Sequence, residues 1–290
     1  MIDKPEGPSS AEVVQRVKAV LRAKKVGHLG TLDPFASGLL LLGINEGTKI
    51  ADIFLAAQKS YAGVVALGVE TDTQDSTGKV LEARDVPSLG EEEIENLQKA
   101  FTGTLWQTPP MFSALKKEGV RLYRFARQGR SVPRPPRQIK IERLRLWKLG
   151  PAEIGFELAC SKGTYVRTLA SDMGKFLGCG AHLKSLRRLS CGPFALEQAV
   201  RLRDVERLKE SGKIPLVSLS QVLAHLPQVR MESGPVSQVR MGQQRVLAEL
   251  GPPQEGEKMV RLVDPEGDLV ALAHWVEDAR IWRLFRVFSS

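Results

Sequence analysis

The acid Asp33 stands in a glycine-rich stretch, residues 27–43, that ends in the apolar run 39–42. Pro34 fixes its own φ and disfavours helical backbone at the preceding residue, which favours an extended conformation at Asp33. Glycines in the stretch allow a bulky partner to approach the backbone closely; they are Gly27, Gly30 and Gly38. A carboxylate on such a loop, anchored by a buried strand, is displayed to a molecule outside the chain. The alternative is an ordinary Asp-Pro turn before a core strand.

Three further stretches carry polar residues next to regular structure. Tyr61 lies in a β-branched run, residues 59–68, where a tyrosine is usually a half-buried packing residue. The acidic loop 71–78 lacks the acid spacing of a calcium-binding loop, so we expect a turn. Residues 162–169, Lys-Gly-Thr-Tyr-Val-Arg-Thr-Leu, stand at an expected strand-to-helix junction, where a helix N-terminus favours anions.

The positive charge of the chain is concentrated in one segment. Between Lys116 and Lys148 there are twelve lysines and arginines but two acids, whereas the whole chain of 290 residues has a formal charge of +9. A concentrated basic segment suits a polyphosphate backbone. The alternative is a solvated surface face, but charges there usually alternate in sign. We therefore favour nucleic-acid binding over a plain surface.

Composition excludes several other classes. With 42% hydrophobic and 26% charged residues the chain has an ordinary globular composition. No apolar run is long enough for a membrane span, and the N-terminus has no signal-peptide core, so we expect a cytoplasmic protein. The three cysteines are widely spaced and the four histidines isolated, so we expect buried free thiols and no metal site.

Periodicity predicts a mixed α+β chain with a change of texture near its end. Helices are expected after the capping box at Ser9 and Glu12, and over 47–57, 91–101 and up to residue 177. Strands are expected over 139–149 and 154–160. The last sixty residues contain short β-type runs between Gly and Pro turns, which suggest a small barrel; the runs are 236–241, 246–250, 259–263, 269–273 and 282–287.

The stretch around Asp33 closely resembles the catalytic motif of the TruB-type pseudouridine synthases, Gly-His-x-Gly-x-Leu-Asp-Pro-x-Ala-x-Gly-x-Leu. Every fixed position of that pattern is present. Four other motifs match in the expected order: Asp-Lys-Pro-x-Gly at 3–7, the Lys-x-Tyr and Thr-Asp-Thr-x-Asp pieces at 59–78, Gln-x-Pro-Pro…Ser-Ala-Leu-Lys at 107–116, and Lys-Gly-Thr-Tyr-Val-Arg with Leu-Arg-Arg at 162–188. Phe112 replaces a common tyrosine, so it is given no hydrogen-bonding role. In the family, several apolar residues that form a strand usually precede the first motif. Here only Met1 and Ile2 precede it, so whether that strand forms is left open.

The resemblance implies a fold and a domain plan. We expect a mixed β-sheet core of the pseudouridine synthase type, flanked by helices, over 1–220, with a basic insertion over about 113–137 that closes on RNA like a thumb. A small β-barrel-like PUA domain that binds RNA is expected over 229–290. The implied function is isomerisation of uridine 55 in the T loop of tRNA by base flipping, without a cofactor. The implied partner is the T arm of tRNA, with no obligate protein partner, and we expect a monomer.

The resemblance also assigns roles to residues. Asp33 is implied as the nucleophile, with attack on C1′, attack on the base, or a glycal route all left open. Arg167 would pair with Asp33 and lower its pKa, and Tyr61 would stack on the uracil and remove the C5 proton. Pocket and substrate contacts would come from His28, Tyr165, Leu186, Lys59, Arg121, Arg124 and Arg127.

Three rival functions remain at this point. The first is a non-catalytic RNA-binding protein or tRNA chaperone, and chaperone activity is also compatible with catalysis as a second role. The second is the guide-RNA-dependent synthase of archaea and eukaryotes, which shares these motifs. The basic insertion and the lack of a lysine-rich tail favour the stand-alone bacterial type. A small-molecule metabolic enzyme is disfavoured because no cofactor motif occurs.

Overall fold

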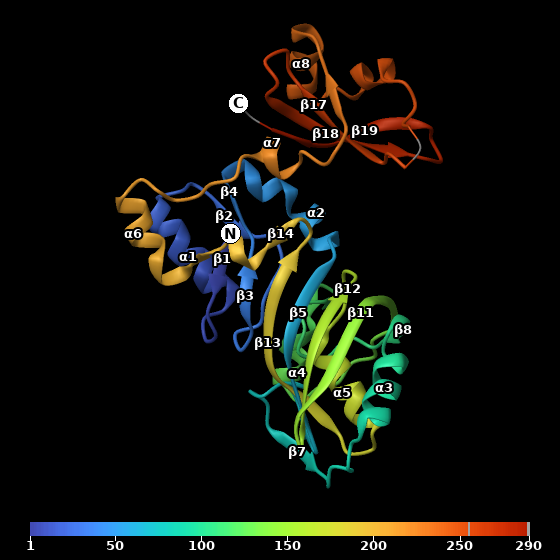
Figure 1. The fold of residues 1–290 in the computed structure, drawn as a ribbon. Coiled ribbons are helices and arrows are strands. Elements are labelled where there is room, and N and C mark those ends of the chain that lie inside the picture. Colours follow the sequence, from blue (N-terminus) through green and yellow to red (C-terminus); the bar gives the residue numbers. More distant parts are fainter. Residues whose placement is uncertain (255, 289–290) are drawn as a thin grey trace.

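A long mixed β-sheet forms the centre of the molecule. The computed structural model describes residues 1–254 and 256–288. In the central sheet the strands run in the order β15-β1-β3-β13-β5-β12-β11-β8, with β14 paired to β13. Its strands are β1 (Ile2–Lys4), β3 (Ser37–Leu40), β5 (Lys59–Leu67), β8 (Gly103–Gln107), β11 (Arg137–Gly150), β12 (Glu153–Cys160), β13 (Ala181–Cys191), β14 (Phe194–Ala195) and β15 (Val200–Arg201). Figure 1 shows the four long strands β5, β11, β12 and β13 side by side.

The long strands are antiparallel neighbours, whereas β3 pairs in parallel with β13 and β1 with β15. Burial alternates along β5, with positions 59, 61, 65 and 67 buried, because successive side chains point to opposite faces. One face therefore carries the core, and the α+β expectation is confirmed.

Helices cover that core face. Leu97 of α3 and Met173 of α5 share one apolar cluster with Ile139 and Ile141 of β11. Helix α1 begins with the expected capping box, in which Ser9 and Glu12 satisfy each other's backbone N–H. The helices are α1 (Ser10–Leu21), α2 (Ala51–Ala56), α3 (Glu91–Ala100), α4 (Leu122–Arg127), α5 (Val166–Phe176), α6 (Val205–Glu210), α7 (Leu219–Val222) and α8 (Ser233–Arg240), and the 3-10 turns are η1 (Asn45–Ile50), η2 (Leu196–Gln198), η3 (Leu202–Asp204) and η4 (Gln244–Glu249).

A small second domain follows at the C-terminal end of the chain, at the top of Figure 1. Its sheet has the order β16-β17-β18-β19, from β16 (Gln228–Arg230), β17 (Met259–Val263), β18 (Leu269–Val276) and β19 (Ile281–Val287). Two of the expected strands are wrong: 236–241 lies largely in α8 and 246–250 in η4. Val236 and Val239, three residues apart, are both buried, which is the spacing of a helix face.

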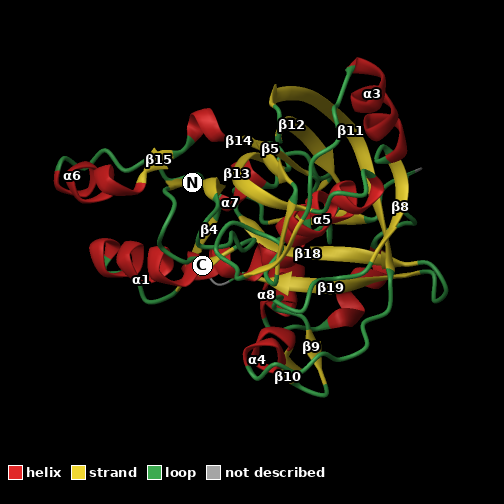
Figure 2. Ribbon diagram, turned by 90° about the horizontal axis from the view of Figure 1, so that it is seen from below, coloured by secondary structure: helices red, strands yellow, loops and turns green. Residues whose placement is uncertain are grey.

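The basic segment forms a separate unit that projects from the sheet. It contains β9 (Lys116–Lys117), β10 (Val120–Arg121) and α4, and Figure 2 shows these three elements together at the edge of the molecule. The expected helical stripe of arginines is only partly correct. Helix α4 spans six residues, with Arg121 as its N-cap and Arg130 beyond its end, because the Gly and Pro residues that follow cannot extend it. The remaining short strands pair as β2 (Val26–His28) with β4 (Leu42–Ile44), and β6 (Val69–Thr71) with β7 (Val80–Ala83).

Candidate active site

Asp33 lies on the loop between β2 and β3, and neighbouring elements hold the backbone on both sides of it. The Ser10 hydroxyl donates to the carbonyl of Leu32 and accepts from its N–H, both at 2.8 Å. The buried Lys4 ammonium donates to the Pro34 carbonyl at 3.2 Å. The backbone of the acid is therefore fixed before any ligand arrives.

Arg188 of β13 holds the same loop and the strand after it, through two carbonyls of the loop and one of β3. Its guanidinium donates to Gly30, Thr31 and Leu39 at 3.0, 3.3 and 2.7 Å, and the residue is 2% exposed. The glycine at 38 is required here, because its φ is +99° and a Cβ would lie 2.3 Å from the Arg188 carbonyl oxygen.

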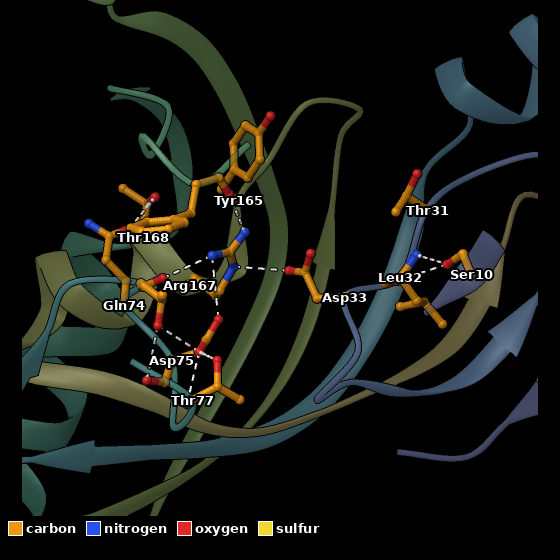
Figure 3. Close-up of polar contacts among 12 residues, drawn as sticks. Ser10, Thr31, Leu32, Asp33, Gln74, Asp75, Thr77, Tyr165, Arg167 and Thr168 are labelled. Carbon is orange, nitrogen blue, oxygen red and sulfur yellow. Dashed lines mark hydrogen bonds and ion pairs between the residues drawn. The ribbon is translucent and has the colours of Figure 1, made fainter. Parts of the chain in front are cut away.

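Arg167, in the first turn of α5, is the central cation of the site (Figure 3). Its Nε lies 2.9 Å from Asp33 Oδ2, and its Nη1 lies 3.4 Å from Asp75 Oδ2. Two carbonyls complete its contacts, those of Thr73 and Phe112, each at 2.9 Å. The guanidinium is thus held by groups from three separate segments, and the expected pairing of Arg167 with Asp33 is present.

Asp75 is a site residue that the sequence reading missed. Its side chain is 5% exposed, and its Oδ1 accepts hydrogen bonds from Thr73 Oγ1 at 2.7 Å, Thr77 Oγ1 at 2.6 Å and the Thr77 N–H at 3.0 Å. The loop is a turn, as expected, but its acid is directed inward at Arg167. The local signal was the pair of threonines on either side of the acid, Thr73 and Thr77, which does not encode the contact with Arg167.

Burial sets the acidity of Asp33. Desolvation raises the pKa of this carboxyl above its usual 3.8, and Arg167 opposes the rise. The expected lowering by Arg167 is present, but desolvation outweighs the ion pair, so the pKa of Asp33 is raised overall. The side chain is still 39% exposed, and no hydrogen bond among the described residues engages its second oxygen, Oδ1. One oxygen of the carboxylate is thus paired and the other is open.

Tyr61 and Leu186 lie on adjacent strands in the core cluster that borders the site. They are 9% and 7% exposed. Burial raises the pKa of Tyr61 to about 12, against a smaller opposing effect of Arg188. Tyr61 is therefore a neutral phenol at neutral pH, suited to packing against a flat ring, and it can take a proton only through the small fraction present as phenolate.

Tyr165 and His28 each lie next in the chain to a segment of the site. Tyr165 is the N-cap of α5, directly before the helix that carries Arg167, and Figure 3 shows its ring beyond the guanidinium. His28 ends β2, just ahead of the Asp33 loop. Burial first, and then Arg188, lower the pKa of His28, so the imidazole is neutral at pH 7.

The remaining substrate candidates differ in what they offer. Lys59 donates to the carbonyls of Phe54, Leu55 and Ala57. Those bonds use all three of its donors and close the C-terminal end of α2, which leaves none for a substrate. The three arginines of the basic unit, Arg121, Arg124 and Arg127, are exposed. All three contact Tyr123, because Arg121 and Arg124 hydrogen-bond with its hydroxyl and the Arg127 guanidinium lies 5.4 Å from its ring centroid.

Within residues 1–254 and 256–288 the structure contains no cluster of three or more His, Cys, Asp or Glu side chains that could hold a metal. In the same part of the chain, every helix is too short or too polar to cross a membrane.

The fold and the site together define a class: an α+β enzyme that presents one open carboxylate, held by a buried arginine, at the end of a long mixed sheet. The family profile described as TruB family pseudouridylate synthase (N terminal domain) matches residues 18–166. The profile described as tRNA pseudouridylate synthase B C-terminal domain matches residues 167–226. The chain belongs to the TruB family of pseudouridylate synthases.

Relatives of known name agree over the full length. A protein named tRNA pseudouridine synthase B from Geobacter sulfurreducens is 44% identical, over 100% of this chain and 98% of that protein. One of the same name from Nitrosococcus oceani is 41% identical, over 100% and 94%. Among solved structures, a Cbf5-Nop10-Gar1 complex contains a chain with a TM-score of 0.71 and 26% identity, covering 99% of this chain and 84% of that one.

Proposed function

We propose that this protein isomerises uridine 55 in the T loop of tRNA to pseudouridine, with Asp33 as the nucleophile acting on a flipped-out nucleotide. The observation that carries the proposal is the Asp33 carboxylate, ion-paired through one oxygen to the buried Arg167. The reaction class is supported by membership of the family and by relatives named tRNA pseudouridine synthase B.

The reaction is an isomerisation and needs no outside electron carrier. The N1–C1′ bond of the nucleotide breaks, the uracil turns, and a C5–C1′ bond forms. C5 then loses its proton and N1 gains one, so the atoms balance. An ionised carboxylate that forms a transient bond with the substrate divides one difficult step into two easier ones.

Arg167 supplies the electrostatic part of this mechanism. Its Nε holds Oδ2 and so turns Oδ1 toward the substrate side, and its charge favours the ionised carboxylate over the protonated one. Because Arg167 is itself fixed by Asp75 and two carbonyls, the pair needs little reorganisation when a nucleotide arrives.

We assign the remaining residues of the site to the flipped base. Tyr61 packs against the uracil face and takes part in removal of the C5 proton, while Tyr165 and Leu186 form the walls of the pocket. His28, neutral and ahead of the loop, fills the space left in the RNA. Extrusion of a base costs a few kcal/mol of unstacking, which such contacts offset.

Binding of the tRNA body is assigned to surfaces outside the pocket. Arg121, Arg124 and Arg127 contact phosphates of the T arm, and the C-terminal domain acts as a PUA-type RNA-binding module. We further propose that the enzyme works as a monomer in the cytoplasm, where tRNA is matured. The proposed catalytic domain covers 1–220, with the insertion at about 113–137, and the second domain 229–290.

The test is incubation of the protein with an unmodified tRNA transcript, without cofactors. The RNA is then treated with a carbodiimide, which modifies pseudouridine, and read by reverse transcription. The proposal predicts a single stop that marks pseudouridine at position 55. Modification at another position would overturn the substrate site, and salt-sensitive tRNA binding without any modification would indicate a chaperone instead.

A further inference from the structure

A buried amide lies behind the pocket wall and has no role in the mechanism above. Gln107 is the last residue of β8 and is 2% exposed. A primary amide so deeply buried must find partners for both its donor and its acceptor. It finds them on a single residue: the Tyr165 N–H donates to Gln107 Oε1 at 2.8 Å, and Gln107 Nε2 donates to the Tyr165 carbonyl at 3.1 Å. The side chain thus pairs with Tyr165 as a neighbouring strand would.

The place of this contact matters because α5 starts there. Tyr165 is the N-cap of the helix, in extended backbone with φ −98° and ψ 106°, and its own side chain makes no capping bond. Its carbonyl also accepts from the Leu169 N–H, which opens the helix. The ring of Tyr165 and the guanidinium of Arg167 both depart from the backbone that the amide holds.

The strand next to β8 holds the ring of the same residue. Arg137, the first residue of β11, is the backbone partner of Gln107. Its guanidinium lies 4.9 Å from the centroid of the Tyr165 ring and also donates to the Gly163 carbonyl. Two paired residues at the edge of the sheet therefore hold Tyr165, Gln107 through its main chain and Arg137 through its ring.

We propose that Gln107 is a positioning residue for catalysis, which sets the Tyr165 wall and the first turn of α5 so that Arg167 meets Asp33 correctly. The inference rests on the proposed function. A misplacement of about 1 Å in such a constellation lowers a rate by on the order of 100-fold, even when the altered residue does not touch the substrate.

The main test substitutes the amide by groups of similar size. Gln107→Met removes both hydrogen bonds. The control Gln98→Met removes one hydrogen bond between a glutamine side chain and a strand away from the site, the bond that the Leu146 N–H donates to Gln98 Oε1 at 2.9 Å. We expect the single-turnover rate at saturating tRNA to fall about 10- to 100-fold for Gln107→Met only, with the tRNA dissociation constant of both variants within about twofold of the parent value.

A second variant gives a readout that a purely structural role would not move. In Gln107→Glu the ionised carboxylate accepts from the Tyr165 N–H but repels its carbonyl, whereas the protonated acid accepts and donates as the amide does. The single-turnover rate of Gln107→Glu, divided by that of the parent at each pH, should therefore rise as pH falls. Gln107→Met should show a flat ratio.

The outcomes separate the two proposals. If the parent protein forms no pseudouridine, the proposed function fails. If the parent is active and Gln107→Met matches its rate, the positioning role is wrong. The positioning role is also wrong if the rate loss of Gln107→Met is explained by its lower thermal stability and the rate of Gln107→Glu relative to the parent does not change with pH. That result would describe a residue that only stabilises the fold.

Discussion

Two carboxylates share one arginine, and their surroundings give them different tasks. Asp75 is 5% exposed and fully hydrogen-bonded within its turn, whereas Asp33 is 39% exposed and presents a free oxygen. Asp75 and the carbonyls fix Arg167, and Arg167 in turn orients Asp33. The different tasks of the two carboxylates follow from burial, because a carboxylate whose oxygens are all buried and paired cannot contact a substrate.

The raised pKa of Asp33 predicts how the rate depends on pH. Protonation removes the nucleophile, so activity is present above the pKa of Asp33 in the folded protein and is lost as pH falls through it. Because burial raises that pKa from 3.8, the acid limb of the single-turnover rate should have its midpoint above 3.8. Circular dichroism at each pH separates this limb from acid unfolding. If the single-turnover rate stays unchanged as the pH falls to 3.8, the assignment is wrong.

Removal of the Tyr61 hydroxyl tests whether this residue does more than pack. Tyr61→Phe keeps the ring and its burial, so we expect tRNA affinity within about twofold of the parent value. The single-turnover rate should fall by on the order of 100-fold or more, the size of a lost proton-transfer contribution. Unchanged single-turnover kinetics would remove Tyr61 from proton transfer and leave only its packing role.

At the scale of elements, the sequence predicted β3, β5, β11 and β12 of the central sheet and the helix that carries Arg167, because long alternating or helical patterns are strong signals, but it did not predict β13, which lies between β3 and β5. It failed in short runs, as at α8, where a strand was expected although the buried Val236 and Val239 have the three-residue spacing of a helix face. It also missed the inward turn of Asp75. That acid meets Arg167 far along the chain, and no local pattern encodes a contact of that kind.

The basic unit of β9, β10 and α4 should contribute to RNA binding through charge alone. Replacement of Arg121, Arg124 and Arg127 by alanine should weaken tRNA binding. It should also flatten the slope of log K against log salt by up to about 0.9 per lost phosphate contact, the value known for duplex DNA. A matched triple variant on another exposed surface, at Arg203, Lys209 and Lys213, should leave the slope unchanged. An unaltered slope in the first variant would show that the unit does not contact phosphates.

At the scale of the whole molecule, the two domains share a core. Phe288 and Leu272 of the C-terminal domain lie in one buried cluster with Leu39 and Phe54 of the catalytic part. Lys49 Nζ donates to the Val287 carbonyl at 2.8 Å, and Arg286 Nε to the Lys49 carbonyl at 2.9 Å. Leu39 belongs to β3, the strand that follows the Asp33 loop, so the second domain supports the strand next to that loop.

This shared core predicts cooperative unfolding. Phe288→Ala removes a ring that is 3% exposed, and such a deletion typically costs about 3–5 kcal/mol of unfolding free energy. We expect a single urea transition at lower midpoint, measured by fluorescence and circular dichroism together. Ile281→Ala, at a position 44% exposed in the same domain, should leave the midpoint almost unchanged. Two separated transitions in the parent protein would contradict a shared core.

The central claim is that the carboxylate of Asp33 performs the reaction, and Asp33→Asn tests it most directly. Asparagine keeps the size of the side chain but loses the charge and the nucleophilic oxygen. Single-turnover assays with excess enzyme and unmodified tRNA, read by carbodiimide mapping, should show bound tRNA and no pseudouridine at position 55. Formation of pseudouridine by Asp33→Asn at close to the parent rate would contradict the account.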